Sequence, residues 1–375
     1  MGYKMKKISV SFSDSEWEGV VELHWQWFKE RAEKTSFRIS LNHAREGRKT
    51  RDISRKEYIM HEMRLKDEDD LRKIVCASFD EMKKIKKKYR RLVKSQKPDN
   101  LQQNPSVAEK KKYAYQMKKY ERGEKLKIAF GYDDFITPSD GNWYEDFVRN
   151  NREWNSKIYC EFLKIDVCPY CERQYIFRYE TKGNRRTTAE MDHFFAKSKY
   201  PFLSCTLLNL IPSCHVCNYG KLNYDREITY PYSEGFGDGV RFRAFFSGDS
   251  INLEKPVDSK NVKIKIRKVT MFSADGRDKI FLNRVKESVK VFNLENLYNC
   301  HVIELKDLFI RYRNYCYLKR KEIARLVYCD GCDDAVLALH AREMKKILLG
   351  LPVVNENAEY PLKKFKEDII KQLDE

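Results

Sequence analysis

Two C-x-x-C pairs constrain the fold of this chain more than any other feature of its sequence. Cys168 and Cys171 form the first pair, Cys214 and Cys217 form the second, and residues 172–213 lie between them. Two such turns can direct four thiolates at one ion and complete the tetrahedral shell of a structural zinc site. We therefore predict one zinc ion that stabilises the fold and takes no part in chemistry. Four buried thiols without a metal are the alternative, because cysteines are common in protein cores.

The residues between the pairs predict a hairpin that is followed by a helix. Alternating apolar and polar side chains predict a strand over residues 172–179, and residues 182–184 have the composition of a turn. We expect the returning strand over residues 187–193 and a helix over residues 214–222. An adjacent acid and histidine would then lie at the end of the returning strand.

Asp192, His193 and Asn218 are the side chains of this region that are best suited to hydrolysis. Cleavage of a phosphodiester needs a base for the attacking water and a cation near the scissile phosphate. A neutral imidazole suits the first need, and a carboxylate with an amide oxygen forms a magnesium-like ligand set for the second. The alternative for His193 is a histidine that only completes a core. Candidates for contacts with the phosphate are Lys197, Lys199 and Lys221.

Residues 168–221 resemble the HNH nuclease family, also called the ββα-metal fold. The matching segments are residues 191–194 (Met-Asp-His-Phe), 197–201, 209–212 and 214–218 (Cys-His-Val-Cys-Asn), together with Lys221. The resemblance implies that His193 is the general base and that Asp192 and Asn218 bind a catalytic Mg²⁺ or Mn²⁺. It also implies that Asn209 holds the loop that orients His193. The sequence departs from the family pattern at two positions, with Asn218 in place of a histidine and Ala196 in place of a frequent proline.

The same resemblance implies an activity and a partner. The chain is expected to be an endonuclease that hydrolyses DNA to a 3′-hydroxyl and a 5′-phosphate and cuts one strand per active site, so a duplex cut would need a dimer or two events. The motifs are similar to those of HNH subunits in prokaryotic antiviral defence, particularly the Septu type, which acts with an ATPase partner. Two alternatives stay open: a zinc-stabilised nucleic-acid-binding protein without catalysis, and a nuclease that cuts RNA.

The charge of the chain also favours a nucleic-acid partner. The formal net charge is +18 and the isoelectric point is about 9.2, which favours a polyanion. Residues 81–127 hold 17 Lys and Arg against 5 Asp and Glu, a net charge of +12. Cations in such a segment displace counterions from phosphates, and its interleaved tyrosines could stack on unpaired bases. The alternative is a pair of charged helices that are merely solvated.

Cysteine content and hydropathy bear on the compartment. Eleven cysteines and no secretory signal predict a reducing, cytoplasmic environment. No apolar run approaches the roughly 20 residues that span a bilayer, so no membrane association is expected. Cys329 and Cys332 form a third C-x-x-C without a nearby second pair, and their role stays open.

The predicted fold class is α+β, with a small ββα-metal module that contains the zinc site and mainly helical regions on both sides. We predict a helical, basic region over residues 1–140, the nuclease module over 141–230, a β-rich extension over 231–285 and a helical region over 286–375. His24 is expected in a core, because it lies on an apolar helical stripe. Further expectations are loop and short strand over 36–58, single helices over 68–94 and 143–163, a hairpin over 228–246, and a strand over 261–271.

Overall fold

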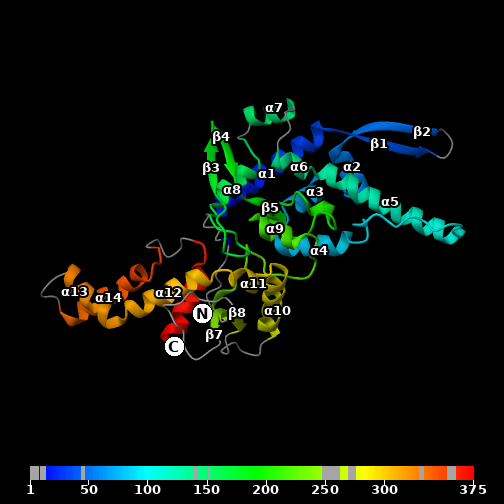
Figure 1. Cartoon of the computed structure of the whole chain (residues 1–375). Coiled ribbons are helices and arrows are strands. Elements are labelled where there is room, and N and C mark those ends of the chain that lie inside the picture. Colours follow the sequence, from blue (N-terminus) through cyan, green and yellow to red (C-terminus); the bar gives the residue numbers. More distant parts are fainter. Residues whose placement is uncertain are drawn as a thin grey trace. The chain divides into compact units, whose positions relative to one another are not determined.

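The computed structural model describes residues 8, 14–43, 47–137, 142–150, 153–246, 262–268, 276–328, 333–352 and 360–375. These residues form helices and two-stranded antiparallel sheets, which confirms the α+β class (Figure 1). The chain divides into two compact units. We call residues 8–165 and 176–225 the N-terminal unit, and residues 166–175 and 226–375 the C-terminal unit. Cys329 and Cys332 lie outside the described residues.

The core of the N-terminal unit forms around helix α1, Asp14–Lys34. Its aromatic side chains Trp27 and Phe28 are fully buried, and so is His24. Nδ1 of His24 accepts a hydrogen bond from Nε1 of Trp154 at 3.0 Å, and Nε2 donates to the carbonyl of Cys205 at 2.8 Å. The prediction of a core histidine is therefore confirmed.

The segment after α1 differs from the prediction in two ways: it begins with longer strands than expected, and its later part forms two short helices instead of one long helix. Strands β1, Ser36–His43, and β2, Gly47–Ser54, form a hairpin where loop and a short strand are expected, and α2, Arg55–Met63, follows. The single helix predicted over 68–94 is wrong, because α3, Glu68–Val75, and α4, Phe79–Tyr89, are separate helices. Ser78 starts α4 in a capping box with Glu81.

Two further helix ends have a local cause. Helix α5, Val107–Phe130, ends at Gly131, whose φ of +65° suits glycine. A Cβ at Gly131 would lie 1.8 Å from the buried guanidinium of Arg31, so the position accepts no larger residue. The helix predicted over 143–163 is instead α7, Asn142–Asn150, and α8, Ser156–Leu163, because Asn155 caps the start of α8. The short helix α6 is Tyr132–Ile136.

The region between the C-x-x-C pairs contains two small sheets instead of one hairpin. Strands β3, Arg178–Thr181, and β4, Asn184–Thr187, form a hairpin around the predicted turn, but the strand predicted over 172–179 overlaps β3 only at residues 178 and 179. The strand predicted over residues 187–193 is confirmed over 190–193 as β5, Glu190–His193, but it does not return along β3, because it pairs with β6, Leu210–Ser213. Burial explains why the strands form two separate sheets, because β5 is buried at three of four positions whereas β3 and β4 are mostly exposed. The predicted helix is confirmed as α9, His215–Lys221.

The C-terminal unit combines one β-hairpin with helices. The predicted strand over 261–271 corresponds to β8, Val262–Lys268, which pairs with β7, Val240–Phe246, so a hairpin confined to residues 228–246 is not observed. Phe242 of β7 packs against Tyr298 and Phe365. Its backbone N–H donates to Asp368 at 3.0 Å. The helices are α10, Gly276–Val291; α11, Leu294–Tyr298; α12, Val302–Asn314; α13, Tyr317–Tyr328; α14, Asp334–Leu348; and α15, Lys363–Asp374.

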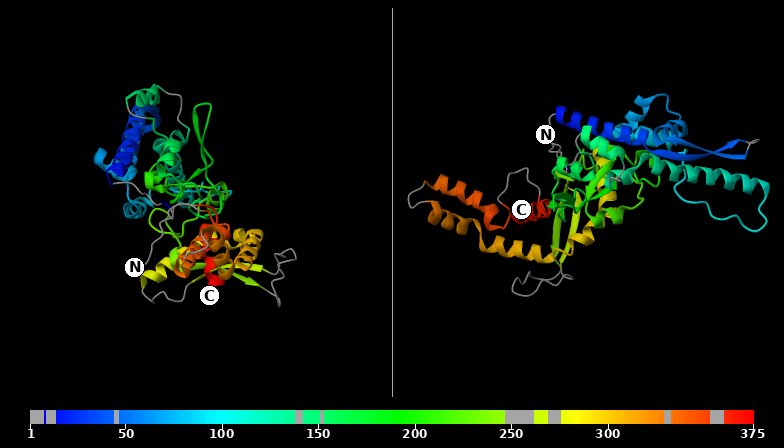
Figure 2. Two further views of the ribbon diagram at one scale, coloured as in Figure 1. Left: turned by 90° about the vertical axis from the view of Figure 1, so that its left-hand side faces the viewer. Right: turned by 90° about the horizontal axis from the view of Figure 1, so that it is seen from above.

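Helices α13 and α14 lie side by side, with Ala324, Leu337 and Met344 buried between them (Figure 2). This matches the helical pattern that the sequence predicts for the last part of the chain. None of the helices in the described ranges is long and apolar enough to cross a membrane.

Candidate active site and metal centre

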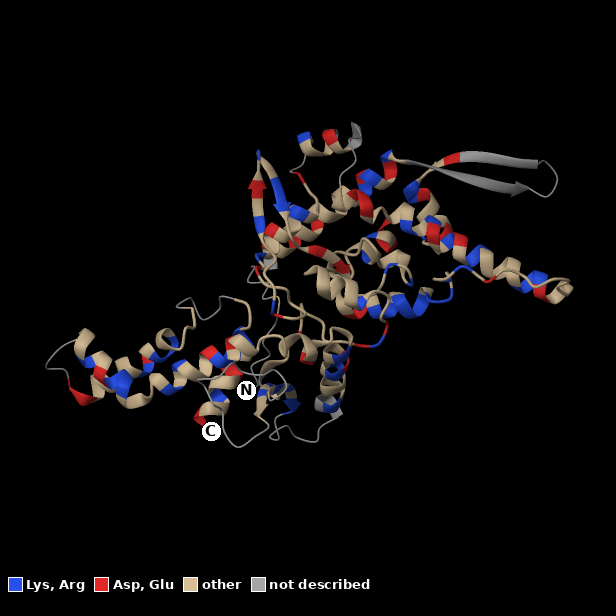
Figure 3. Ribbon diagram, in the orientation of Figure 1, with Lys and Arg blue, Asp and Glu red and all other residues tan. Residues whose placement is uncertain are grey.

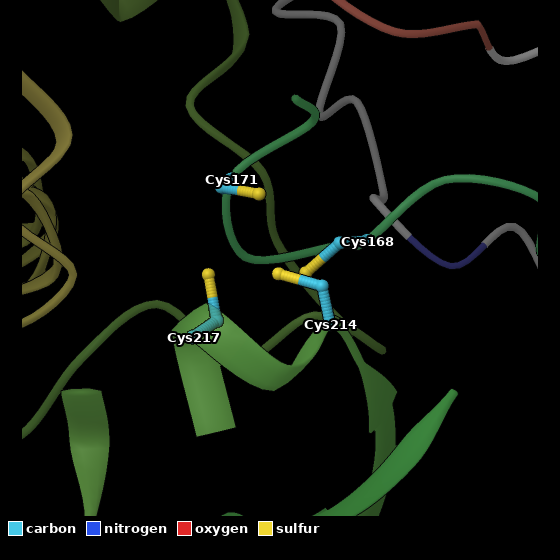
Figure 4. A group of neighbouring side chains, drawn as sticks. All are labelled: Cys168, Cys171, Cys214 and Cys217. Carbon is cyan, nitrogen blue, oxygen red and sulfur yellow. The ribbon is translucent and has the colours of Figure 1, made fainter. Parts of the chain in front are cut away.

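The four cysteines of the two C-x-x-C pairs form one cluster, and their sulfur atoms point toward one another (Figure 4). The sulfur atoms lie within 4.8 Å of one another, and all four side chains are buried. Thiolates about 2.3 Å from a tetrahedral zinc ion would lie about 3.8 Å apart, which is close to this arrangement. Four sulfur donors favour zinc over a hard cation. The cluster could therefore hold a structural metal such as zinc.

Backbone hydrogen bonds close each C-x-x-C turn. The carbonyl of Cys168 accepts the N–H of Glu172 at 2.8 Å, and the N–H of Cys168 donates to the carbonyl of Gln174 at 2.9 Å. In the second turn, Cys214 occupies the N-cap position of α9 and its carbonyl accepts the N–H of Cys217 at 3.1 Å.

A pocket of about 240 Å³ lies beside the second turn, between β5 and α9. Asp192, His193 and Asn218, the three residues predicted for hydrolysis, all line this pocket, and so does Lys197. Lys221 and Asn209 are not among its lining residues. The remaining lining residues are Glu190, Ala196, His215, Tyr219, Leu222 and Asn223.

Asp192 forms a buried ion pair with Lys221. The ammonium lies 3.1 Å from Oδ1 and 2.9 Å from Oδ2 of Asp192, and it also donates to the carbonyl of His193 at 2.5 Å. The side chain of Lys221 is 1% exposed, so it holds the strand residues and does not reach a phosphate in solvent as the sequence suggested. The reason is geometric, because the last turn of α9 faces β5.

The ring of His193 has a defined tautomer. Nε2 lies 3.0 Å from the carbonyl of Ser204, which can only accept, so Nε2 carries the proton and Nδ1 keeps a lone pair. The ring contacts that of Tyr132 at a centroid distance of 4.2 Å. Burial, followed by the charge of Lys197, lowers the pKa of His193 to about 3. The imidazole is therefore neutral at pH 7, and Nδ1 can accept a proton.

Asn209 joins the two loops that surround His193. Its side-chain oxygen accepts the N–H of Phe195 at 2.7 Å, and its amide nitrogen donates to the carbonyls of Phe195 and Leu203 at 3.1 and 2.9 Å. Phe195 follows His193 by two residues, and Leu203 precedes the carbonyl that holds the ring. Asn209 thus stabilises the backbone on both sides of the imidazole.

Sequence reasoning did not identify Glu190 and His215. Oε2 of Glu190 accepts from the amide of Asn218 at 2.7 Å, and Oε1 lies 2.7 Å from Nδ1 of His215. Burial opposes ionisation of Glu190, but the hydrogen bonds from Asn218 and His215 outweigh it and lower the pKa. Because the amide nitrogen of Asn218 is engaged, its oxygen is left for a cation. Two signals were present: Glu190 lies two strand positions before Asp192, and His215 lies three helix positions before Asn218.

Lys197 and Lys199 lie on the loop after His193. The ammonium of Lys197 lies 4.5 Å from the ring centroid of Tyr132 and 3.6 Å from Asp133. That of Lys199 lies 3.7 Å from Asp225. Both side chains are partly exposed, as a contact with a phosphate requires.

Comparison with known proteins identifies no relative: no family model, no curated protein and no solved structure matches the chain.

Proposed function

We propose that the chain is a metal-dependent endonuclease of the HNH type that hydrolyses phosphodiester bonds in DNA. The observation that carries the proposal is that Asp192, His193 and Asn218 line one pocket, although Asn218 follows His193 by 25 positions in the sequence. The antiparallel pair β5 and β6, followed directly by α9, supports it, because this is the ββα order that the resemblance implies.

The proton transfer is assigned to Nδ1 of His193. Nδ1 takes a proton from a water molecule, whose oxygen forms a bond to phosphorus while the bond from phosphorus to the 3′-oxygen breaks. The 3′-oxygen leaves with a proton from solvent, and the phosphate stays on the 5′ side. Ser204 holds the opposite nitrogen, so the ring cannot turn away. An anionic phosphate in the pocket would raise the low pKa of His193 and strengthen it as a base.

Asp192 and Asn218 would hold a Mg²⁺ or Mn²⁺ ion, which supplies a positive charge at the scissile phosphate. Their carboxylate and amide oxygens are ligands that such hard cations prefer. Asp192 has to share its carboxylate with the ammonium of Lys221, which would repel the cation. Glu190 lines the same pocket and adds a second negative charge that offsets this repulsion.

The test is nicking of supercoiled plasmid by the purified full chain with magnesium. Replacing His193→Ala removes the base and is expected to slow nicking by about 10²–10⁴-fold. Binding of DNA and the content of zinc should stay unchanged, which separates a lost base from a lost fold. Nicking by the variant at the rate of the unmodified chain would overturn the proposal. Labelled RNA in the same assay decides which nucleic acid is cut.

A further inference from the structure

The exposed side of helix α4 carries Lys83, Lys87 and Arg90, which we call the α4 basic face. We propose that this face binds the phosphate backbone of duplex DNA and positions it at the pocket of Asp192 and His193. The inference rests on the proposed function, because it assigns the surface that delivers the substrate to that site. All the residues involved belong to the N-terminal unit.

The charges of α4 are separated along its length. Helix α4 contains five lysines and two acids, Asp80 and Glu81, and both acids lie in its first turn. Lys83, Lys87 and Arg90 recur at spacings of four and three residues, so they form one stripe. The opposite side packs into the core through Met82 and Tyr89. Figure 3 shows Lys and Arg gathered along this helix.

Helix α4 packs directly on the loop that follows His193. The rings of Phe79 and Phe195 stack with a centroid distance of 6.0 Å. The ammonium of Lys86 lies 4.8 Å from the centroids of both Phe195 and Tyr200. The same loop contributes Lys197 to the pocket. The helix that carries the α4 basic face is therefore in direct contact with the loop that follows His193 and contributes Lys197 to the pocket.

The seam between α4 and the loop keeps a surplus of positive charge. Asp225 lies 3.0 Å from Lys86 and 3.7 Å from Lys199, so one carboxylate meets two ammonium groups. On the α4 basic face itself, Lys83 is paired with Asp80, an exposed contact of little energy. Lys87 and Arg90 are exposed and have no carboxylate partner among the described residues. Their charges are available to an external anion.

The chemistry of the face fits phosphates better than a protein surface. Within the described ranges, none of the large exposed apolar side chains lies on α4. Protein interfaces are built around apolar and aromatic residues, whereas interfaces with DNA are polar and strongly positive. Lys83 and Arg90 lie seven positions apart, a rise of about 10 Å along the helix, and this length of duplex carries about six phosphate charges. A duplex therefore offers each cation of the stripe a partner.

The experiment measures binding of a fluorescent duplex of about 30 base pairs to the full chain, without added magnesium. The test variant combines Lys87→Ala with Arg90→Ala. Each phosphate contact contributes about 0.9 to the slope of log affinity against log salt, so the slope should become shallower by about 2. Between 50 and 200 mM salt, the affinity of the variant should consequently fall about tenfold less than that of the unmodified chain.

A matched control removes two charges elsewhere. Arg342 and Lys346 are exposed and lie one turn apart on α14, and their replacement by alanine should leave affinity and slope unchanged. The exchange variant Lys87→Arg with Arg90→Lys keeps both charges and should bind like the unmodified chain. Unchanged binding by the exchange variant shows that binding requires the two charges, and matching thermal unfolding temperatures of the alanine variant and the unmodified chain exclude a folding defect.

The outcomes separate this inference from the proposed function. An unchanged slope in the alanine variant would overturn the inference even if the chain nicks plasmid. Loss of binding in that variant, with no nicking by the unmodified chain, would support the DNA-binding face and overturn the nuclease. Tighter binding to single-stranded RNA than to the duplex at equal salt would overturn the assignment of duplex DNA.

Discussion

The ammonium of Lys221 lies 2.9 and 3.1 Å from the two carboxylate oxygens of Asp192 and also reaches the carbonyl of His193. The buried ammonium of Lys221 on α9 thus positions both Asp192 and His193 of β5. The side chains of Lys221 and Asp192 are only 1% and 5% exposed. Removing one partner of a buried ion pair leaves the other charge buried without compensation, and this property makes the contact testable.

Replacing Lys221→Met should lower the free energy of unfolding by about 3–5 kcal/mol, because Asp192 is left buried without its countercharge. Adding Asp192→Asn to this variant removes the unpaired charge and should recover part of the loss. Urea unfolding of the two single variants and the double variant measures the coupling. If the losses in free energy of unfolding of the two single variants simply add in the double variant, the two residues are not coupled and the ion pair is not important for stability.

If the proposed cation site is correct, Glu190→Ala should weaken the binding of magnesium at this site. Without the carboxylate, the amide of Asn218 loses the hydrogen bond that orients its oxygen. Loss of an orienting partner usually weakens metal binding by about 10–100-fold, so half-maximal nicking should need that much more magnesium. Glu180, an exposed glutamate on β3, provides the matched control. Equal magnesium dependence of nicking by the Glu190 and Glu180 variants would show that Glu190 does not orient Asn218 for the cation.

The cysteine cluster predicts about one tightly bound zinc per chain. Cys214→Ser removes one thiolate from the shell and should lower both the zinc content and the thermal unfolding temperature, since metal binding contributes to folding. Cys300→Ser is the control, because Cys300 is exposed and lies outside the cluster. Elemental analysis and thermal unfolding provide the two measurements. A full complement of zinc in Cys214→Ser would exclude the four-sulfur site.

His24 should make the stability of the chain depend on pH. Burial lowers its pKa from 6.5 to about 4, so the unfolded chain binds a proton in a range where the folded chain does not. The free energy of unfolding should therefore fall as pH drops from about 6.5 to 4, with a loss from this group of about 2 kcal/mol between pH 7 and 5. Urea unfolding of His24→Gln should show a correspondingly smaller fall. Equal pH dependence in both proteins would contradict this account.

Local sequence patterns predicted several elements correctly. Helix α9, strand β8 and the turn at residues 182 and 183 lie where the sequence places them. Their signals come from residues a few positions apart, such as turn formers or alternating side chains. The break between α3 and α4 also had a local signal, Ser78 three residues before Glu81, but the helical pattern on both sides hid it.

The pairing of β5 illustrates what local patterns cannot decide. The sequence predicts that residues 187–193 return along the strand over 172–179, whereas in the structure β4 returns along β3 and β5 pairs with β6. Pairing depends on which distant segment can cover Met191 and its neighbours, and β6 places Pro212 opposite Met191 and Ile211 opposite Asp192. No property of residues 187–193 alone contains that information.

The sequence by itself determined the types and spacing of the key side chains: four cysteines in two pairs, an acid beside a histidine, and an asparagine at the start of a helix. Only the tertiary structure decided that Lys221 holds Asp192, that Glu190 holds Asn218, and that α4 packs against the loop after His193. The spacing within a turn follows from short-range backbone geometry. Contacts between residues tens of positions apart depend instead on how the whole core packs.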